Sequence, residues 1–184
     1  MSPRQSPLAV LPPPWLDFLR EFDDLLSHPV ELHCLGGFVL AALYGLPRPT
    51  EDLDCLPALS REEAQEIQSV AGRESKLARR YKVHVQVVTV ADVPENYKAR
   101  LQPILPGSFL RLRLLALEVY DIVLSKLVRN SPVDDADVRF LIQKGVLDSA
   151  SLRERYEREL RPLLLAHQGR HDTTLRLWLE YFKG

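Results

Sequence analysis

Cysteine is scarce in this sequence, and the positions of the two cysteines exclude several classes of protein. Cys34 and Cys55 are the only two among 184 residues, which is too few for a disulfide scaffold. Neither cysteine belongs to a spacing typical of a zinc site, because His33 and Cys34 are simply adjacent. Both lie beside apolar segments, so we expect them to be buried free thiols.

Long apolar runs are also absent, which argues against a membrane protein. No stretch approaches the ~20 apolar residues that a transmembrane helix needs. A secretory signal peptide is not expected either, because prolines occupy the N-terminal region where its apolar segment would lie. The sequence also lacks a Walker phosphate loop and a G-x-S-x-G nucleophile elbow. We therefore expect a soluble, cytoplasmic protein that does not associate with membranes.

Neither sign of charge dominates the chain. The 24 Lys and Arg residues nearly balance the 25 Asp and Glu residues, giving a net charge of −1. This balance argues against a protein that binds nucleic acid over its whole surface. Residues 73–82 and 153–161 form two blocks rich in Arg and Lys, and these could still contact phosphate. The simpler interpretation of each block is a solvated helix face.

Helical and strand-like patterns alternate in the first part of the chain. Apolar residues recur at helical spacing between Pro14 and Pro29, and the S-x-x-E capping box at Ser60 predicts a helix that begins at Arg61. Short apolar or alternating segments predict strands at residues 30–35, 53–56, 82–90 and 109–117. The combination indicates an α/β (α+β) domain.

After residue 117 the pattern is helical. It predicts helices over residues 118–128 and 134–144, a helix that begins at the capping box of Ser151, and a last helix capped by Asp172. These changes of pattern divide the chain into a flexible N-terminal lead-in at residues 1–13, an α/β core at 14–117 and a helical region at 118–184 packed on the core.

The segment from Cys34 to Cys55 begins with a glycine pair. Gly36 and Gly37 follow a strand-like segment and precede the apolar helix expected at Phe38–Tyr44. The N-terminus of a helix presents unpaired N–H groups and a partial positive charge, which suit a phosphate. The simpler alternative is a strand–turn–helix corner in which glycine only permits a positive φ.

The same segment ends with a pair of acids. Asp52 and Asp54 flank Leu53, so in a strand both carboxylates point to one face of the sheet. Like charges this close repel unless a cation or a proton lies between them. Carboxylate oxygens favour Mg²⁺ or Mn²⁺ as that cation. The alternative is a solvated pair with a purely structural role.

In this order, G-G and then R-x-T-x-D-x-D resemble the signature of the polymerase-β-like nucleotidyltransferase superfamily. The pattern is most similar to minimal nucleotidyltransferases related to the toxins of type IV toxin–antitoxin (abortive infection, AbiEii-type) systems. The resemblance implies a small mixed sheet with flanking helices, and Mg²⁺-dependent transfer of a nucleotidyl group from an NTP to an RNA or protein acceptor. It also implies an antitoxin as a possible partner. By resemblance, the nucleotide is bound by Gly36, Gly37, Arg48 and Thr50, and the metal by the catalytic acids Asp52 and Asp54.

A second segment, Y-D-I-V-L-S-K-L-V-R-N-S-P-V-D-D-A-D-V, is similar to the helix–turn–helix region of the same toxin-related family. The resemblance makes Lys126 a ligand of the triphosphate and aligns Asp134 and Asp137 with the family's acids. Val133 stands where the family has an arginine. Without the resemblance, Lys126 is interpreted as a solvated lysine and Asp134 as an acid that complements a helix dipole.

The resemblance implies a third carboxylate from a neighbouring strand, but the strand expected at residues 82–90 carries no acid. The positions facing the acid pair hold His84 and Gln86, which makes Gln86 an additional site candidate. Three interpretations therefore stay open: an active transferase, a catalytically silent module of the same fold that binds a nucleotide or a partner, and a structural protein.

Overall fold

The structure, a computed structural model, describes residues 11–56, 58–88 and 91–183. The chain divides into two compact units. The first comprises Met1–Val90 and Leu101–Leu117, and the second Ala91–Arg100 and Glu118–Gly184. Residues 1–10 of the expected lead-in and residues 89–90 of an expected strand lie outside the described residues. The sequence placed residues 91–100 in the core, whereas in this division they belong with the C-terminal helices.

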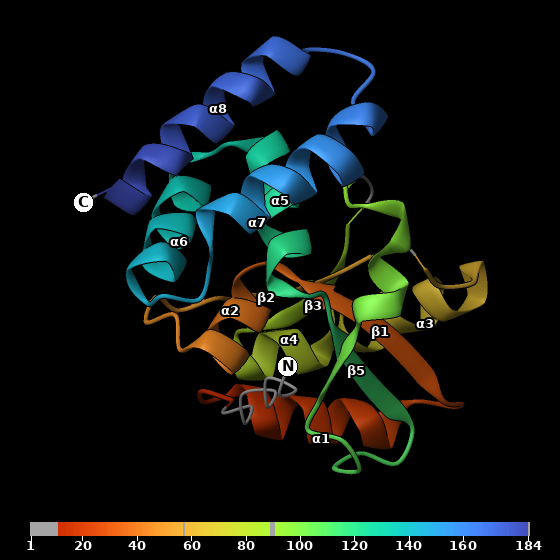
Figure 1. The fold of residues 1–184 in the computed structure, drawn as a ribbon. Coiled ribbons are helices and arrows are strands. Elements are labelled where there is room, and N and C mark those ends of the chain that lie inside the picture. Colours follow the sequence, from red (N-terminus) through yellow and green to blue (C-terminus); the bar gives the residue numbers. More distant parts are fainter. Residues whose placement is uncertain (1–10, 57, 89–90, 184) are drawn as a thin grey trace. The chain divides into compact units, whose positions relative to one another are not determined.

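The first unit is built on a five-stranded mixed sheet with the strand order β3-β2-β1-β5-β4 (Figure 1). β1 pairs with β5 and β2 with β3 in parallel, whereas β1 with β2 and β4 with β5 are antiparallel. The strands are β1 (Val30–Leu35), β2 (Asp52–Cys55), β3 (His84–Val87), β4 (Gln102–Ile104) and β5 (Leu112–Ala116). The predicted α/β fold with a small mixed sheet and flanking helices is confirmed.

Helices of the first unit supply much of its apolar core. They are α1 (Trp15–Leu25), α2 (Gly36–Tyr44), α3 (Arg61–Ala71) and α4 (Lys76–Tyr81). α1 contacts α3 and α4, and α2 contacts β1 and β2. Trp15, Phe18 and Phe22 recur at helical spacing on α1 and are fully buried. Burial of such side chains contributes about 1.5–3 kcal/mol each, so α1 is a principal stabilising element of this unit.

Asp23 ties α1 to the beginning of β5. Its buried carboxylate accepts hydrogen bonds from the backbone N–H groups of Leu110, Arg111 and Leu112, at 2.7–2.8 Å. Burial alone raises the pKa of Asp23, but the three backbone hydrogen bonds outweigh it and hold the pKa below its usual value. Asp23 therefore orders the turn from which β5 starts.

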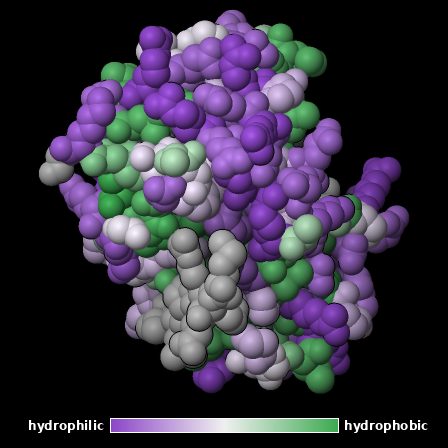
Figure 2. All heavy atoms as spheres, viewed as in Figure 1, coloured by the Kyte–Doolittle hydropathy of each residue, from purple (hydrophilic) through white to green (hydrophobic). Residues whose placement is uncertain are grey.

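The second unit is mainly helical. It contains the 3₁₀-helix η1 (Glu95–Arg100), α5 (Val119–Arg129), α6 (Pro132–Gln143), α7 (Ser149–Arg155), the π-helix η2 (Tyr156–Leu160), the 3₁₀-turn η3 (Arg161–Leu163), α8 (Gln168–Glu180) and the 3₁₀-turn η4 (Tyr181–Lys183). α5, α6 and α8 contact one another. The face of this unit that is visible in Figure 2 is largely hydrophilic, with hydrophobic patches among the polar residues.

Buried ion pairs explain why residues 91–100 belong to the second unit. Arg100, at the end of η1, donates to both carboxylate oxygens of Asp121 on α5, at 2.7 and 3.1 Å. Asp121 is fully buried and also accepts from Arg155 at 2.7 Å. These partners are 21 and 34 residues from Asp121, so the local sequence pattern does not reveal them.

Several predicted element boundaries are wrong. Strand β4 was not expected, and β5 is shorter than the strand predicted at residues 109–117. α7 is capped by Asp148, not by a capping box at Ser151. α8 begins at Gln168, and Asp172 lies inside it, where Arg161 and Tyr156 donate hydrogen bonds to its carboxylate and lower its pKa to about 2. Among the described residues, no helix is both long and apolar enough to cross a membrane.

Candidate functional site

Gly36 occupies a corner that only glycine fits. It directly follows Leu35, the last residue of β1, and begins α2 with a φ of +73°, a conformation that L side chains rarely adopt. A Cβ at this position would lie 2.7 Å from the Oδ2 atom of Asp54. The carboxylate of Asp54 therefore lies directly against the first residue of the helix.

Gly37 makes a similar close approach to the loop before β2. A Cβ on Gly37 would lie 2.9 Å from the Nη2 atom of Arg48 and 3.3 Å from the Oγ1 atom of Thr50. The structure thus brings Arg48, Thr50 and Asp54 together around the glycine pair, as the motif predicts. A hollow of about 210 Å³ adjoins the loop and is lined in part by Pro47, Arg48 and Thr50.

The two acids lie on one face of β2. Leu53 and Cys55 are buried, whereas Asp52 and Asp54 are half-buried, so the strand alternates as its pattern predicts. Thr50 donates through its hydroxyl to Oδ1 of Asp52 at 2.9 Å, which orients that carboxylate.

The neighbouring strand β3 presents no acid beside this pair. The parallel register places His84 beside Asp52 and Gln86 beside Asp54. Gln86 is exposed, whereas His84 is 7% exposed. Within the described part of the chain, no group of three or more His, Cys, Asp or Glu side chains is arranged to hold a metal ion. The carboxylates available at this site are therefore those of Asp52 and Asp54.

Lys126 lies in a buried ion cluster of the second unit. Its amine donates to Asp134 at 3.0 Å and to Asp137 at 2.8 Å, and the residue is 2% exposed. Arg129 also donates to Asp134, at 2.8 Å. Lys126 is thus not the solvated lysine of the simpler interpretation, and its role toward a triphosphate stays a prediction.

Asp134 has several partners in this cluster. Burial raises its pKa, but hydrogen bonds from Arg129 and Ser131 and the charge of Lys126 outweigh burial and hold the pKa far below its usual value. Ser131 and Asp134 also form the capping box that begins α6. The predicted helix-start role of Asp134 is confirmed, and the ion pair to Lys126 is a second role.

Both cysteines are buried free thiols, as predicted. They face each other across β1 and β2. Burial raises the pKa of Cys55 to about 12 and that of Cys34 well above its usual value. A thiol reacts as its thiolate, so neither cysteine is a nucleophile at neutral pH.

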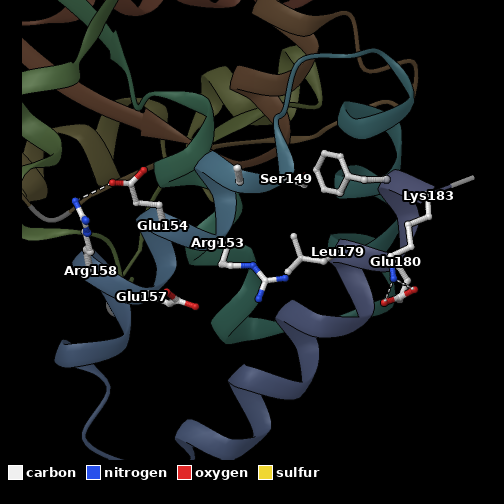
Figure 3. A pocket seen from close by; sticks show the side chains of 10 residues that line it. Ser149, Arg153, Glu154, Glu157, Arg158, Leu179, Glu180 and Lys183 are labelled. Atoms are coloured by element: carbon white, nitrogen blue, oxygen red, sulfur yellow. Dashed lines mark hydrogen bonds and ion pairs between the residues drawn. The ribbon is translucent and has the colours of Figure 1, made fainter.

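A pocket of about 530 Å³ in the second unit contains none of the predicted site residues (Figure 3). Glu154 and Arg158 form an ion pair on one side of it, and Glu180 and Lys183 form another. Arg153 extends between these pairs toward Leu179 (Figure 3). Acidic and basic groups are equally numerous in its wall, so the pocket shows no preference for an anion.

The glycine corner, the adjoining acid pair and the mixed sheet together define a nucleotidyltransferase-like protein. Residues 19–183 match the family described as "Nucleotidyltransferase of unknown function (DUF6036)", and the chain belongs to this family. The comparisons with curated proteins and with solved structures gave no match. Nucleotidyl transfer is thus the class of reaction to which the family assigns the chain, and a nucleotide is the implied substrate.

Proposed function

We propose that the chain is a Mg²⁺-dependent nucleotidyltransferase that moves a nucleotidyl group from an NTP to a hydroxyl of an RNA or protein acceptor. The observation that carries the proposal is the position of the Asp54 carboxylate against Gly36, at the beginning of α2. A phosphate docked at this helix end lies beside carboxylates that can hold a cation.

In the proposed reaction the acceptor oxygen forms a bond to the α-phosphorus of the NTP. The bond from that phosphorus to the bridging oxygen breaks, pyrophosphate leaves with the electron pair, and the hydroxyl proton passes to solvent. The N–H groups at Gly36 and Gly37 bind the β- and γ-phosphates. Arg48 neutralises part of their charge, and Thr50 keeps Asp52 oriented.

Asp52 and Asp54 fit a single Mg²⁺ or Mn²⁺ ion. Mg²⁺ is commonly bound through one or two carboxylates together with substrate phosphates, and the acid pair is half-buried beside the phosphate-binding corner. When bound, the ion supplies charge neutralisation at the phosphates of the donor. The chain itself supplies two carboxylates, the helix N-terminus and the guanidinium of Arg48.

Lys126 is proposed as a further ligand of the triphosphate, on the basis of the family pattern. Because its amine is held by Asp134 and Asp137, contact with a phosphate requires the amine to exchange at least one of these partners. We propose that the two acids hold the amine of Lys126 in position until the nucleotide binds.

The resemblance to type IV toxins supports a proposed role as the toxin of a cytoplasmic toxin–antitoxin pair. Induced expression of the native chain in a bacterial host is expected to arrest growth, whereas the Asp54→Asn variant at the same level is not. Growth arrest by both forms, or by neither, contradicts the toxin role.

One observation favours a second candidate function. β3 carries Gln86 and His84 beside the acids instead of a carboxylate, so a catalytically silent module that binds a nucleotide or a partner is the alternative. It predicts binding of an NTP without transfer to any acceptor.

A label-transfer experiment separates these functions. Each NTP, labelled at the α-phosphate, is incubated with Mg²⁺, the native chain and either total RNA or total protein of a bacterial host. The proposed enzyme transfers the label to one of the two fractions, and Asp54→Asn abolishes the transfer, while Asp24→Asn, a charge removal at an exposed position of α1, leaves it unchanged. NTP binding without label in either fraction supports the silent module.

A further inference from the structure

A basic cleft of about 440 Å³ opens where β2 and β3 begin in the first unit. Its wall includes Arg73 after α3, Arg79 on α4, Lys82 at the end of α4 and His84 at the beginning of β3. Glu51 contributes the only carboxylate among the described residues that line it. Basic groups therefore outnumber acidic ones in a concave surface, which concentrates positive potential.

The three cations of the cleft form no ion pair with the described residues. Among the described residues, no carboxylate lies within ion-pair distance of Arg73, Arg79 or Lys82, and all three are exposed. The adjacent Arg80 differs, because its guanidinium pairs with Glu21 on α1 at 2.9 Å. The basic block at residues 73–82 is thus not one uniform solvated face, and part of its charge lines the cleft with no counter-ion in the described part of the chain.

His84 supplies a second, independent indication of a ligand. It is 7% exposed, and within the described part of the chain its buried Nε2 atom has no hydrogen-bond partner. Buried polar atoms are paired in the great majority of cases. His84 lines the cleft, so a turn of its ring toward the cleft would let a bound oxygen-rich group provide the partner that the described residues do not.

The order of the strands relates this cleft to the acid pair. β2 lies between β1 and β3, with the glycine corner at the end of β1 and His84 on β3. Asp52 is the direct neighbour of His84, and Asp54 contacts Gly36. The acids therefore lie between the corner proposed for the donor phosphates and the basic cleft.

We propose that the cleft binds the phosphodiester backbone of single-stranded RNA, and that it holds an RNA acceptor beside the acid pair. This inference rests on the proposed function and selects RNA over protein as the acceptor. Several cations that have no ion-pair partner among the described residues line this one cleft and match the repeated charges of a nucleic-acid strand, whereas a protein acceptor has no such repeated anionic pattern.

The first measurement is the affinity for a fluorescein-labelled RNA of about 12 nucleotides of mixed sequence, by fluorescence anisotropy over a range of salt concentrations. The cleft variant is Arg73→Ala/Arg79→Ala. The matched control is Arg61→Ala/Lys76→Ala, which removes the same charge from exposed positions on α3 and α4 that form no ion pair with the described residues and do not line the cleft.

The native chain and the control are expected to bind within about twofold of each other, and the cleft variant at least about tenfold more weakly. Each lost phosphate contact reduces the magnitude of the slope of log affinity against log salt by about 0.7 for a single strand. The cleft variant loses two cations, so the magnitude of its slope is expected to fall by about 1.4. His84→Gln keeps a polar group and is expected to weaken binding less than the double variant.

Mg²⁺–NTP binding distinguishes this inference from the proposed function. The proposal of an RNA-binding cleft is overturned if the native chain binds an NTP but does not bind the RNA. It is also overturned if the control variant loses as much RNA affinity as the cleft variant. Loss of NTP affinity with unchanged RNA affinity in the cleft variant also overturns it and assigns the cleft to the donor. A third outcome is that the native chain binds no NTP while the cleft variant, and not the control, loses affinity for the RNA. That result contradicts the proposed donor site and supports the RNA site.

Discussion

Gly36 combines two constraints at one residue, a left-handed backbone and a carboxylate within contact of its missing side chain. The sequence predicted a glycine corner next to an acid pair, because the residue types and their spacing are local. It could not predict that Asp54, rather than Asp52, touches the corner, since this contact depends on the antiparallel register that places Leu35 beside Asp54.

Substitution of Gly36 by alanine is expected to lower both stability and NTP affinity. Gly107 is a matched control, because its φ is +78° and nothing lies within 4 Å of an added Cβ. Gly107→Ala is expected to cost only the left-handed backbone strain, about 1 kcal/mol. Gly36→Ala is expected to cost more in chemical denaturation and to weaken NTP binding, because the new Cβ displaces Asp54. Equal effects of the two variants contradict the contact.

The cluster around Asp134 gives a prediction on pH. The folded pKa of Asp134 is depressed from its usual 3.8, so its contribution to the free energy of unfolding is present above about pH 4 and is lost as the pH falls through the lower folded value. Asp134→Asn is expected to cost about 3 kcal/mol at pH 7 by leaving the buried amine of Lys126 under-paired. In urea denaturation this cost shrinks below pH 4; a difference that stays constant down to pH 2 contradicts the assignment.

At the scale of the elements, local signals predicted the helix starts that depend on local hydrogen bonds. The capping box at Ser60 begins α3 as predicted, with the backbone N–H of Glu63 donating to the Ser60 hydroxyl at 3.1 Å. The same signal failed at Ser151, because Asp148 accepts from the Ser151 backbone and starts α7 earlier. β4 was missed because its three residues gain their structure from pairing with β5.

Loss of the α3 cap should have a measurable cost. Ser60→Ala is expected to lower the free energy of unfolding by about 1 kcal/mol, because the first turn of α3 loses its side-chain acceptor. Ser69→Ala, at an exposed position inside the same helix, is the control and is expected to be neutral or slightly stabilising. Denaturation with guanidinium chloride compares the two variants, and a Ser60→Ala effect no larger than that of Ser69→Ala contradicts the role of the cap.

At the scale of the whole molecule, the chain forms two units that its sequence only partly delimits. The change to a helical pattern after residue 117 coincides with one border of the second unit. The inclusion of residues 91–100 depends on ion pairs between Arg100 and the distant Asp121 and Glu159, which no local pattern reveals. Likewise, the acid pair could be recognised from its spacing in the sequence. The burial of Lys126 between two carboxylates could not, because it depends on how α5 and α6 pack together.

The central claim is that the glycine corner and the acid pair form one nucleotide-binding site. Calorimetric titration of each NTP in the presence of Mg²⁺ tests it most directly, with the native chain, Asp54→Asn and the charge-matched control Asp24→Asn. The account predicts that the native chain and Asp24→Asn bind an NTP equally well, and that Asp54→Asn binds at least about tenfold more weakly, because a carboxylate that holds the cation is lost. Absence of binding by the native chain, or equal binding by all three forms, would contradict it.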